Sequence, residues 1–473
     1  MSQLSTIVGN KCFADKDDLQ SAVDQYINDD CGNSKLCGVG LIYGWPMSSW
    51  CIGNITDLSY LFKDKATFNE DLSNWDTSRV TTLEGTFSGA KTFNQNLTSW
   101  QTARVINMGS LLYNAKDFNG DISTWDTSSV ITMEGIFSRA TSFAGDVSKW
   151  NLASVTNLKE AFFRANSFSG DISNWQVSRV TTMQGTFAEA TSFTGHSIGS
   201  WDVSSVTSLK DAFRDATSFD ADLGGWNVSR VTTIESIFSG AVKFRGVGLA
   251  NWDISSVTDL GFAFYNAKVF NGDISTLTTS RVTNMQSAFA GATAFDQNLS
   301  LWDVSSVRDM GFLFYNATSF GATNGDISSW STSNVVNMES LLSKAINFDG
   351  EIDRWDVSRV TRMGNMLSGA TNFNRDISSW KISPLTGMYR MLYGAAAFNH
   401  DLCKWRYTFP YPFAGNIFSL SGCTFQEDPQ LDRRGPFCAS SCTDLFPTFL
   451  PTPSPTPSPS SSPAVSCIIY IIC

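Results

Sequence analysis

Hydrophobic residues in this chain follow a pattern that repeats about every 25 residues and is marked by tryptophan. We number each repeat from its tryptophan as position 1. Position 6 is nearly always Val, position 9 is Met, Leu or Ile, position 13 is Phe or Leu, and position 16 is Ala in all but the first repeat. Because these positions are spaced i, i+3, i+7 and i+10, they predict one face of an α-helix. Ser at position 4 would cap its first turn.

The second half of the repeat predicts a short strand. Phe occupies position 19 in every repeat, and Ile or Leu usually stands at position 23, with polar residues between them. A turn followed by a short strand fits this pattern, and the strands of successive repeats would stack in parallel. One strand and one helix cannot bury their apolar faces alone, so each unit must pack on its neighbours.

Fourteen such repeats follow one another through the middle of the chain. Leu277 replaces one tryptophan, and short insertions occur near His196, Gly246 and Ala322. The sequence therefore predicts one α/β solenoid of about 14 strand–helix coils over residues 50–405, with a parallel strand stack. The tryptophans that mark the repeats are Trp50, Trp75, Trp100, Trp125, Trp150, Trp175, Trp201, Trp226, Trp252, Trp302, Trp330, Trp355, Trp380 and Trp405.

Cysteines gather at the two ends of the repeat array, where a solenoid needs caps for its exposed apolar edges. No cysteine lies between residues 52 and 402. Even-numbered groups at both ends predict disulfide-stapled caps in an oxidising compartment; two zinc sites are the alternative, but paired CxxC spacing is missing. The candidates are Cys12, Cys31, Cys37 and Cys51 in an N-terminal cap (1–49, with an amphipathic helix over 17–29), and Cys403, Cys423, Cys438 and Cys442 at a C-terminal cap (406–449).

Beyond the second cap, residues 450–464 alternate Pro with Ser and Thr. This composition predicts an extended stalk, and the apolar tail at 465–473 is too short to span a bilayer. We therefore expect no transmembrane span in this chain. The first eleven residues lack the basic and apolar segments of a signal peptide, so we expect the natural N-terminus to be incomplete here.

The block FNGDISTWDTSSVITMEGIFSRA at 118–140, repeated with changes at 373–395, resembles the repeat of the BspA-like surface-protein family. The resemblance covers residues from about 45 to 406, and the cap ending in YGWP at 43–46 is similar to that of protist members. It implies a curved, leucine-rich-repeat-like solenoid at the cell surface, with adhesive or recognition roles and no catalytic residues. Aromatic residues at positions 1 and 19, where leucine-rich repeats usually carry Leu, leave the curvature open.

Charge and composition exclude several function classes. Lys and Arg total 33 against 44 Asp and Glu, a formal net charge of −11, which argues against a nucleic-acid partner. Two His residues make an imidazole-based metal or acid–base site improbable. Five N-x-S/T sequons, at Asn54, Asn96, Asn227, Asn298 and Asn316, are candidate glycosylation sites and suit the secretory route.

Position 22 carries an acidic side chain in most repeats, including Asp121, Asp146 and Asp171. Stacked coils would bring these carboxylates into a line, where like charges repel. We interpret them as acceptors for backbone N–H groups, because Asn fills the position equally well in two repeats. A calcium-binding stripe made by Asp121, Asp146 and Asp171 is the alternative, although no known calcium-loop motif is present.

These observations favour a non-enzymatic secreted or cell-surface protein that mediates adhesion, recognition or protein–protein interaction through an extended solenoid face. Its partner would be an unknown protein or glycan, no cofactor is predicted, and the variable positions 10, 11, 14, 15, 20 and 21 would carry specificity. The alternative is a calcium-dependent glycan-binding or carbohydrate-active surface protein. No catalytic residue is predicted, because His196 stands alone in a polar turn without a nucleophile at a suitable spacing.

Overall fold

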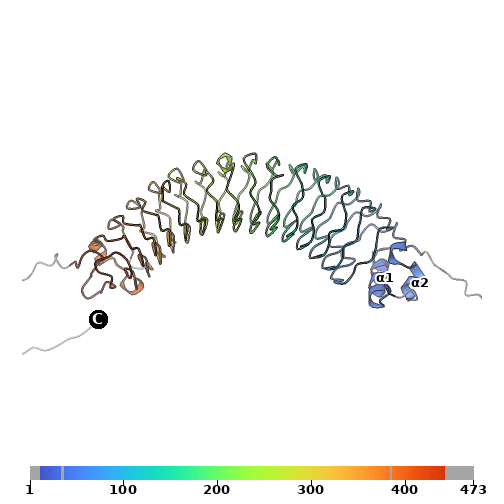
Figure 1. The fold of residues 1–473 in the computed structure, drawn as a ribbon, viewed down its shortest axis with the longest axis horizontal. Coiled ribbons are helices and arrows are strands. Elements are labelled where there is room, and N and C mark those ends of the chain that lie inside the picture. The colour runs from blue at the N-terminus through green and yellow to red at the C-terminus, as the bar shows by residue number, and fades with distance from the viewer. Residues whose placement is uncertain (1–10, 34–36, 384–385, 443–473) are drawn as a thin grey trace, which may run out of the picture.

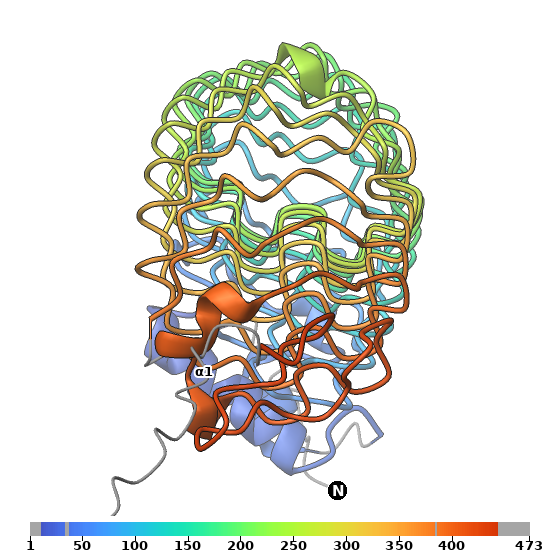
Figure 2. The ribbon, with the colours of Figure 1, turned by 90° about the vertical axis from the view of Figure 1, so that its left-hand side faces the viewer.

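The computed structural model describes residues 11–33, 37–383 and 386–442, and it shows a curved stack of coils with a cap at each end (Figure 1). Seen from one end, the coils are closed loops that lie one behind another, with the end coils displaced from the middle ones by the curvature (Figure 2). Buried apolar side chains fill their interior. The solenoid predicted from the sequence is therefore present, and it is curved. The predicted stalk at 450–464 and the tail at 465–473 lie outside the described residues.

The named elements belong almost entirely to the caps. Helix α1 (Lys16–Asn28) lies where the sequence predicts an amphipathic helix; Asp15 caps it by accepting the Asp18 N–H, and Leu19, Ala22, Val23 and Tyr26 are buried. A shorter helix α2 (Gly38–Tyr43) and the 3-10 helix η1 (Met47–Ser49) complete the first cap. Three further 3-10 helices are η2 (Leu249–Asn251), η3 (Cys403–Tyr407) and η4 (Tyr411–Phe413).

The α-helix predicted within each repeat is wrong. Positions 9 to 16 form consecutive turns in which N–H groups alternate between two kinds of acceptor. In the first coil the Lys63 N–H donates to the Tyr60 carbonyl of the same coil, 3.0 Å away. The N–H groups of Tyr60 and Phe62 instead donate to Glu84 and Thr86 of the next coil, each at 2.8 Å. Half of the amides that a helix would use internally therefore join neighbouring coils.

The backbone at positions 11 and 15 is left-handed in all 14 coils, which no α-helix permits. Examples at position 15 are Asp215 (φ 56°), Gly240 (φ 69°) and Asn266 (φ 54°). The buried positions 9, 13 and 16 were predicted correctly, because turns that repeat every three or four residues turn the same side chains inward as a helix does. Gly, Asn and Asp are frequent at position 15, and this preference is the sequence signal for turns that the helix prediction overlooked.

The parallel strand stack predicted at positions 19 to 23 is also wrong. The parallel pairing lies at position 8 instead, as single bridges that begin at Asp57 and Thr82 and end at Arg362 and Gly387. Positions 20 to 22 are joined across coils mainly by side chains; the Asn94 amide oxygen, for example, accepts the Asn119 N–H at 2.7 Å. Backbone pairing is therefore concentrated on one side of each coil.

Three aromatic ladders fill the interior, at positions 13, 19 and 1. In one pair of neighbouring coils the ring centroids are 5.2 Å apart for Phe137 and Phe162, 6.0 Å for Phe143 and Phe168, and 6.4 Å for Trp150 and Trp175. The indole N–H groups from Trp100 to Trp380 donate to backbone carbonyls 28 to 31 residues earlier, as Trp226 does at the Ile198 carbonyl, 2.9 Å away, whereas the buried Trp405 Nε1 has no hydrogen-bond partner among the described residues. The spacing between coils thus widens from position 13 to position 1, and this difference curves the stack.

Disulfides lie within each cap, as the cysteine pattern predicts. Cys12 pairs with Cys51 and Cys31 with Cys37 at the first end; Cys403 pairs with Cys442 and Cys423 with Cys438 at the second. At the second end, residues 413–419 continue the ladder as a fifteenth set of turns, accepting N–H bonds from the last coil. Ile417 and Phe418 of this set are fully buried and extend the hydrophobic core beyond the last coil. Among the described residues, no helix is long and apolar enough to cross a membrane.

The left-handed turns predict how two glycines respond to alanine. Gly240 has φ 69°, and a Cβ there would lie 2.0 Å from the Asp215 Oδ1 of the preceding coil. We expect Gly240→Ala to lower the free energy of unfolding by about 1–2 kcal/mol, because a left-handed backbone disfavours Cβ and the Asp215 side chain must move. Gly364→Ala is the matched control, since its Cβ would meet nothing nearer than 3.6 Å and its φ is not positive. Equal denaturant midpoints for the two variants would contradict the turn assignment.

Candidate functional site

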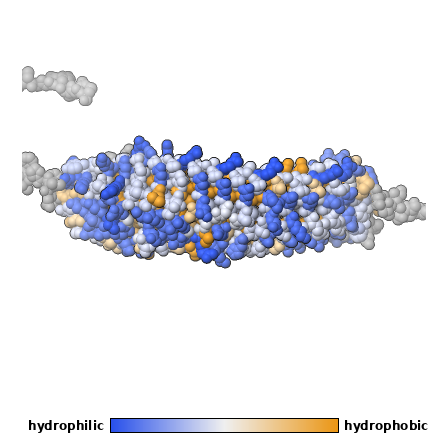
Figure 3. All heavy atoms as spheres, turned by 90° about the horizontal axis from the view of Figure 1, so that it is seen from above, coloured by the Kyte–Doolittle hydropathy of each residue, from blue (hydrophilic) through white to orange (hydrophobic). Residues whose placement is uncertain are grey.

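The concave side of the arc carries the turn ladder at positions 8 to 16. Backbone bonds between coils and the shortest ring spacings lie here, so this side forms the inside of the curve. The opposite crest carries η2, which stands just before Trp252 (Figures 1 and 2). We define the concave face as the outward side chains at positions 10, 11, 14 and 15. The outer, convex surface is largely hydrophilic with scattered apolar residues (Figure 3).

At positions 11 and 14 of the concave face, large and small side chains alternate with a period of two coils. This alternation runs through the first twelve coils and is clearest at position 14. Odd coils carry Lys63, Tyr113, Phe163, Arg214, Tyr265 and Tyr315, all at least partly exposed. Even coils carry Ser88, Ser138, Ala188, Ser239, Ala290 and Ser343, all buried. The surface therefore has ribs on every second coil, about 10 Å apart at the usual spacing of paired strands.

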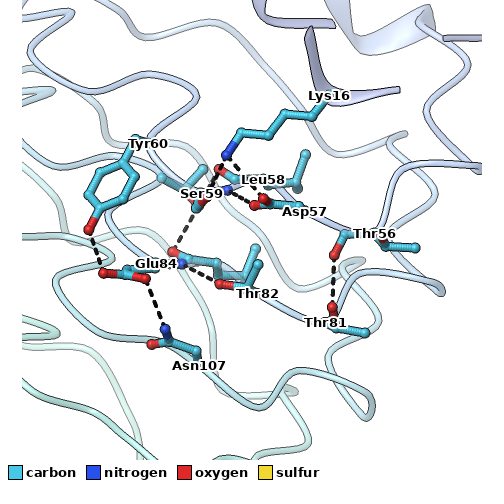
Figure 4. Close-up of polar contacts among 12 residues, drawn as sticks. Lys16, Thr56, Asp57, Leu58, Ser59, Tyr60, Thr81, Thr82, Glu84 and Asn107 are labelled. Carbon is cyan, nitrogen blue, oxygen red and sulfur yellow. Dashed lines mark hydrogen bonds and ion pairs between the residues drawn. The ribbon is translucent and has the colours of Figure 1, made fainter. Parts of the chain in front are cut away.

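Each rib leans over the small residues of the following coil. A Cβ on Gly85 would lie 2.4 Å from the Tyr60 ring, and one on Gly291 would lie 2.3 Å from the Asn266 amide oxygen. At the N-terminal end, the Tyr60 hydroxyl donates to Glu84, which also accepts from the Asn107 amide at 3.0 Å (Figure 4). Side-chain contacts between coils thus hold the ribs in place without any bound ligand.

Arg139 is an uncompensated cation on this face. Its guanidinium lies over the Tyr113 ring at 5.9 Å and the Phe163 ring at 5.7 Å, the ribs on either side of its own coil. In the described part of the chain it forms no ion pair, and its Nε is buried without a hydrogen-bond partner. The equivalent position two coils later holds Glu189, which binds both Arg164 (2.6 Å) and Arg214 (3.2 Å). Arg139 is therefore held in place by aromatic rings and keeps its charge available.

The acidic column at position 22 lies on the opposite edge of the coils, where each side chain serves its own turn. Asp121, Asp146 and Asp171 are exposed, and each Oδ1 accepts the N–H of the serine two residues later at 2.9 Å. These hydrogen bonds, backbone first and then hydroxyl, lower the pKa of all three carboxyl groups. These carboxylates therefore accept backbone N–H groups, as expected from the sequence. Calcium binding by these three residues stays a prediction.

The structure also shows the surroundings of two insertions and of the candidate glycosylation sites. In the insertion near Ala322, the buried Asp296 carboxylate accepts N–H groups from Gly321 (2.9 Å), Thr323 (3.0 Å) and Gly325 (3.0 Å), so the extra residues fold around one side chain. His196 in the first insertion is exposed. Of the candidate glycosylation sites, Asn54, Asn96, Asn227 and Asn298 are exposed and Asn316 is half-buried.

The one group of potential metal-binding atoms found among the described residues is not available to a metal. It consists of Asp401, Cys403 and Cys442. Cys403 and Cys442 are bonded to each other, so neither offers a thiolate.

The two-coil rib pattern was not predicted from the sequence. The sequence signal for it is the alternation of large and small residues at position 14.

The acidic column predicts a pH dependence of stability. Because the pKa values of Asp121, Asp146 and Asp171 are lowered by folding, the carboxylates stabilise the protein above their usual pKa of about 3.9, and that stabilisation is lost as the pH falls through the lower folded values. An Asp121→Asn/Asp146→Asn/Asp171→Asn variant keeps a neutral acceptor at any pH. We expect its melting temperature to fall less than that of the wild type between pH 5 and pH 2. Parallel pH profiles would contradict the assignment.

Three comparisons place the chain among known proteins. No curated protein sequence matches it. Solved structures that it resembles include the Drosophila Toll–Spätzle complex (12% identity, 69% of this chain and 41% of that chain, TM-score 0.23) and the TLR13–ssRNA13 complex (10%, 69% and 49%, TM-score 0.22). A leucine-rich repeat protein from Eubacterium ventriosum is 12% identical over 76% of this chain and 80% of that chain, with a TM-score of 0.30. The chain spans less than half the length of the first two.

The family comparison covers most of the repeat array. The model described as "Mycoplasma protein of unknown function, DUF285" matches residues 42–148, 171–248, 244–325 and 321–410. The matched segments take in nearly all of the coils whose turns, ladders and bridges are described above. The chain is therefore a repeat solenoid that belongs to the DUF285 family.

Proposed function

We propose that this protein is a non-enzymatic recognition solenoid of the extracellular space or cell surface, which binds a macromolecular partner on its concave face. The observation that carries the proposal is the ribbed pattern of exposed aromatic and charged side chains at positions 10, 11, 14 and 15. The core is complete without them, since its ladders lie at positions 1, 9, 13, 16 and 19. Aromatic and arginine side chains dominate the energetics of protein interfaces.

Partner specificity would be set rib by rib. The first ribs contain Tyr113, Phe163 and Arg139 with the Arg164–Glu189–Arg214 network, whereas later ribs contain two aromatic pairs, one of which is Phe262 with Tyr265 at 5.9 Å. Arg139 would bind a carboxylate of the partner, because a guanidinium stacked between rings presents its edge for paired hydrogen bonds. An extended partner would therefore contact a charged segment and then an apolar one.

The disulfides of the two caps support an extracellular or cell-surface location. Four disulfides in two caps favour an oxidising compartment, and four exposed sequons suit the same route. The resemblance to the BspA-like surface proteins supports the same location. The rival function, calcium-dependent glycan binding or carbohydrate processing at the surface, would use the same exposed aromatic rings to stack on sugars.

Binding by the concave face can be tested with defined probes. The full chain would be applied to arrays of extracellular protein domains and of glycans, with Ca²⁺ or with EDTA. We expect a protein ligand whose affinity falls at least tenfold in a Tyr113→Ser/Phe163→Ser/Tyr265→Ser variant, about 1.4 kcal/mol or more. Arg139→Gln should reduce the affinity more at low salt than at high salt, because salt screens the charge of Arg139.

The matched control removes exposed apolar residues outside positions 10, 11, 14 and 15: Ile106→Ser/Ile131→Ser/Val269→Ser, whose side chains are 48%, 49% and 45% exposed. This variant should bind as the wild type does. Equal losses in both variants would contradict a concave site. Glycan binding that EDTA abolishes would establish the rival function instead.

The disulfides make a separate prediction. Alkylation of the unreduced protein followed by mass spectrometry should leave all eight cap cysteines unmodified and recover peptides joining Cys12 to Cys51 and Cys423 to Cys438. A reduced sample of the same protein is the control for alkylation efficiency. Free thiols at these positions in protein isolated from its native source would contradict the extracellular location.

A further inference from the structure

Seven arginines form a stripe along one flank of the arc. Six stand at position 5 of their repeats and Arg308 stands at position 7, and all seven are exposed. Positions 4 to 7 hold no Asp, Glu or Lys in any of the fourteen repeats, although the chain carries a net charge of −11. These positions come between the tryptophan ladder at position 1 and the parallel bridges at position 8, so the stripe lies beside the concave face. The position-5 members of this arginine stripe are Arg79, Arg104, Arg179, Arg230, Arg281 and Arg359.

No carboxylate neutralises the stripe. Within the described part of the chain, none of its arginines forms an ion pair, and two of them donate to the neutral amide oxygen of an asparagine in the preceding coil. The acids at positions 2 and 8, on either side along the chain, accept N–H groups of their own coils. Asp202 accepts from Ser204 at 3.0 Å, and Asp259 accepts from Gly261 at 2.8 Å. The guanidinium charges therefore remain available to a ligand.

Three arginines of the stripe repeat at a regular interval. Arg179, Arg230 and Arg281 occupy position 5 of alternate coils, with serine at this position in the coils between them. Two coils span about 10 Å at the usual spacing of paired strands. This is about one Debye length at physiological salt, so the arginines repel one another only weakly. Because a guanidinium binds an oxyanion through two parallel hydrogen bonds, an extended chain with regularly placed anionic groups would contact these arginines one after another.

A column of threonines accompanies the stripe at position 7. Thr181, Thr207, Thr232 and Thr283 are exposed members of this column. The Thr207 hydroxyl donates to the Thr181 carbonyl at 3.0 Å, and Thr232 and Thr283 repeat this contact with the coils before them. Because each hydroxyl proton is used within the solenoid, the outward side of Oγ1 can only accept. Sugar hydroxyls donate to such acceptors, whereas the backbone of DNA has no donor. The two columns together therefore fit an anionic polysaccharide better than DNA.

We propose that the arginine stripe binds a sulfated polysaccharide. The sulfate groups of this partner pair with the guanidinium groups, and its hydroxyls donate to the threonine column. A sulfate ester stays charged at any physiological pH, so its attraction to the stripe needs no bound metal. This surface is separate from the concave face, and it adds a second partner to the recognition function proposed above.

Heparin is the probe for this surface, beside hyaluronate, whose anionic groups are carboxylates alone, and a short DNA duplex. The full chain would be applied to the immobilised polymers in EDTA over a series of NaCl concentrations. We expect binding to heparin that weakens as salt rises, and weaker binding to the other two polymers. Arg179→Gln/Arg230→Gln/Arg281→Gln should reduce the affinity for heparin at least tenfold. Its melting temperature should match that of the wild type, because the three side chains are exposed.

The matched control is Lys91→Gln/Lys116→Gln/Lys243→Gln, which removes three exposed cations at positions 17 and 18. It changes the net charge by the same amount and should bind heparin as the wild type does. Equal losses in the two variants, or no binding to heparin at low salt, would overturn the proposal. Binding to hyaluronate or DNA as tight as binding to heparin would also overturn it and assign the stripe to another polymer.

The concave-face variant Tyr113→Ser/Phe163→Ser/Tyr265→Ser separates this surface from the one proposed above. It should keep the heparin affinity of the wild type, because its substitutions lie outside positions 4 to 7. A tenfold loss of heparin binding in this variant would contradict a separate surface. Failure of the heparin experiment is therefore distinct from failure of the concave recognition site.

Discussion

The structure depends on how each coil divides its backbone N–H groups between itself and its neighbour. Alternating amides at positions 9 to 16 close turns within a coil or donate to the carbonyls of the next coil. This alternation requires a left-handed backbone at positions 11 and 15. Glycine adopts this conformation without steric cost, whereas residues with a Cβ are strained in it. It also brings adjacent coils closest on one side, so the aromatic ladders on the other side spread apart and the stack bends.

The burial pattern was predictable from the sequence, but the conformation was not. Positions 6, 9, 13 and 16 face inward as expected, because a run of tight turns and a helix share nearly the same periodicity. The two conformations differ in which carbonyls accept the backbone N–H groups. In the sequence, only the residues at position 15, such as Gly240 and Asn266, indicate turns rather than a helix. The strand predicted after position 19 failed because its polar side chains, Asn94 among them, replace backbone pairing between coils.

The candidate surface was located only in part. The variable positions named from the sequence include the four on the concave face, yet averaging over 25-residue repeats hides the contrast between Tyr113 and Ser138, or Tyr265 and Ala290. The caps were easier, because cysteines can be read without knowing the fold.

The ribs make two coils, not one, the natural unit of length. A chain extended by a single coil would keep its backbone ladder and its core, but it would place two large ribs, or two coils with small residues at position 14, side by side. Such a shift of phase is visible near the C-terminal end, where Ser368 stands in an odd coil and Tyr393 in an even one. Changes of 50 residues preserve the surface, and changes of 25 residues alter it while leaving the scaffold intact. Gain or loss of a single repeat is therefore a route by which this solenoid could acquire a new partner without losing its fold.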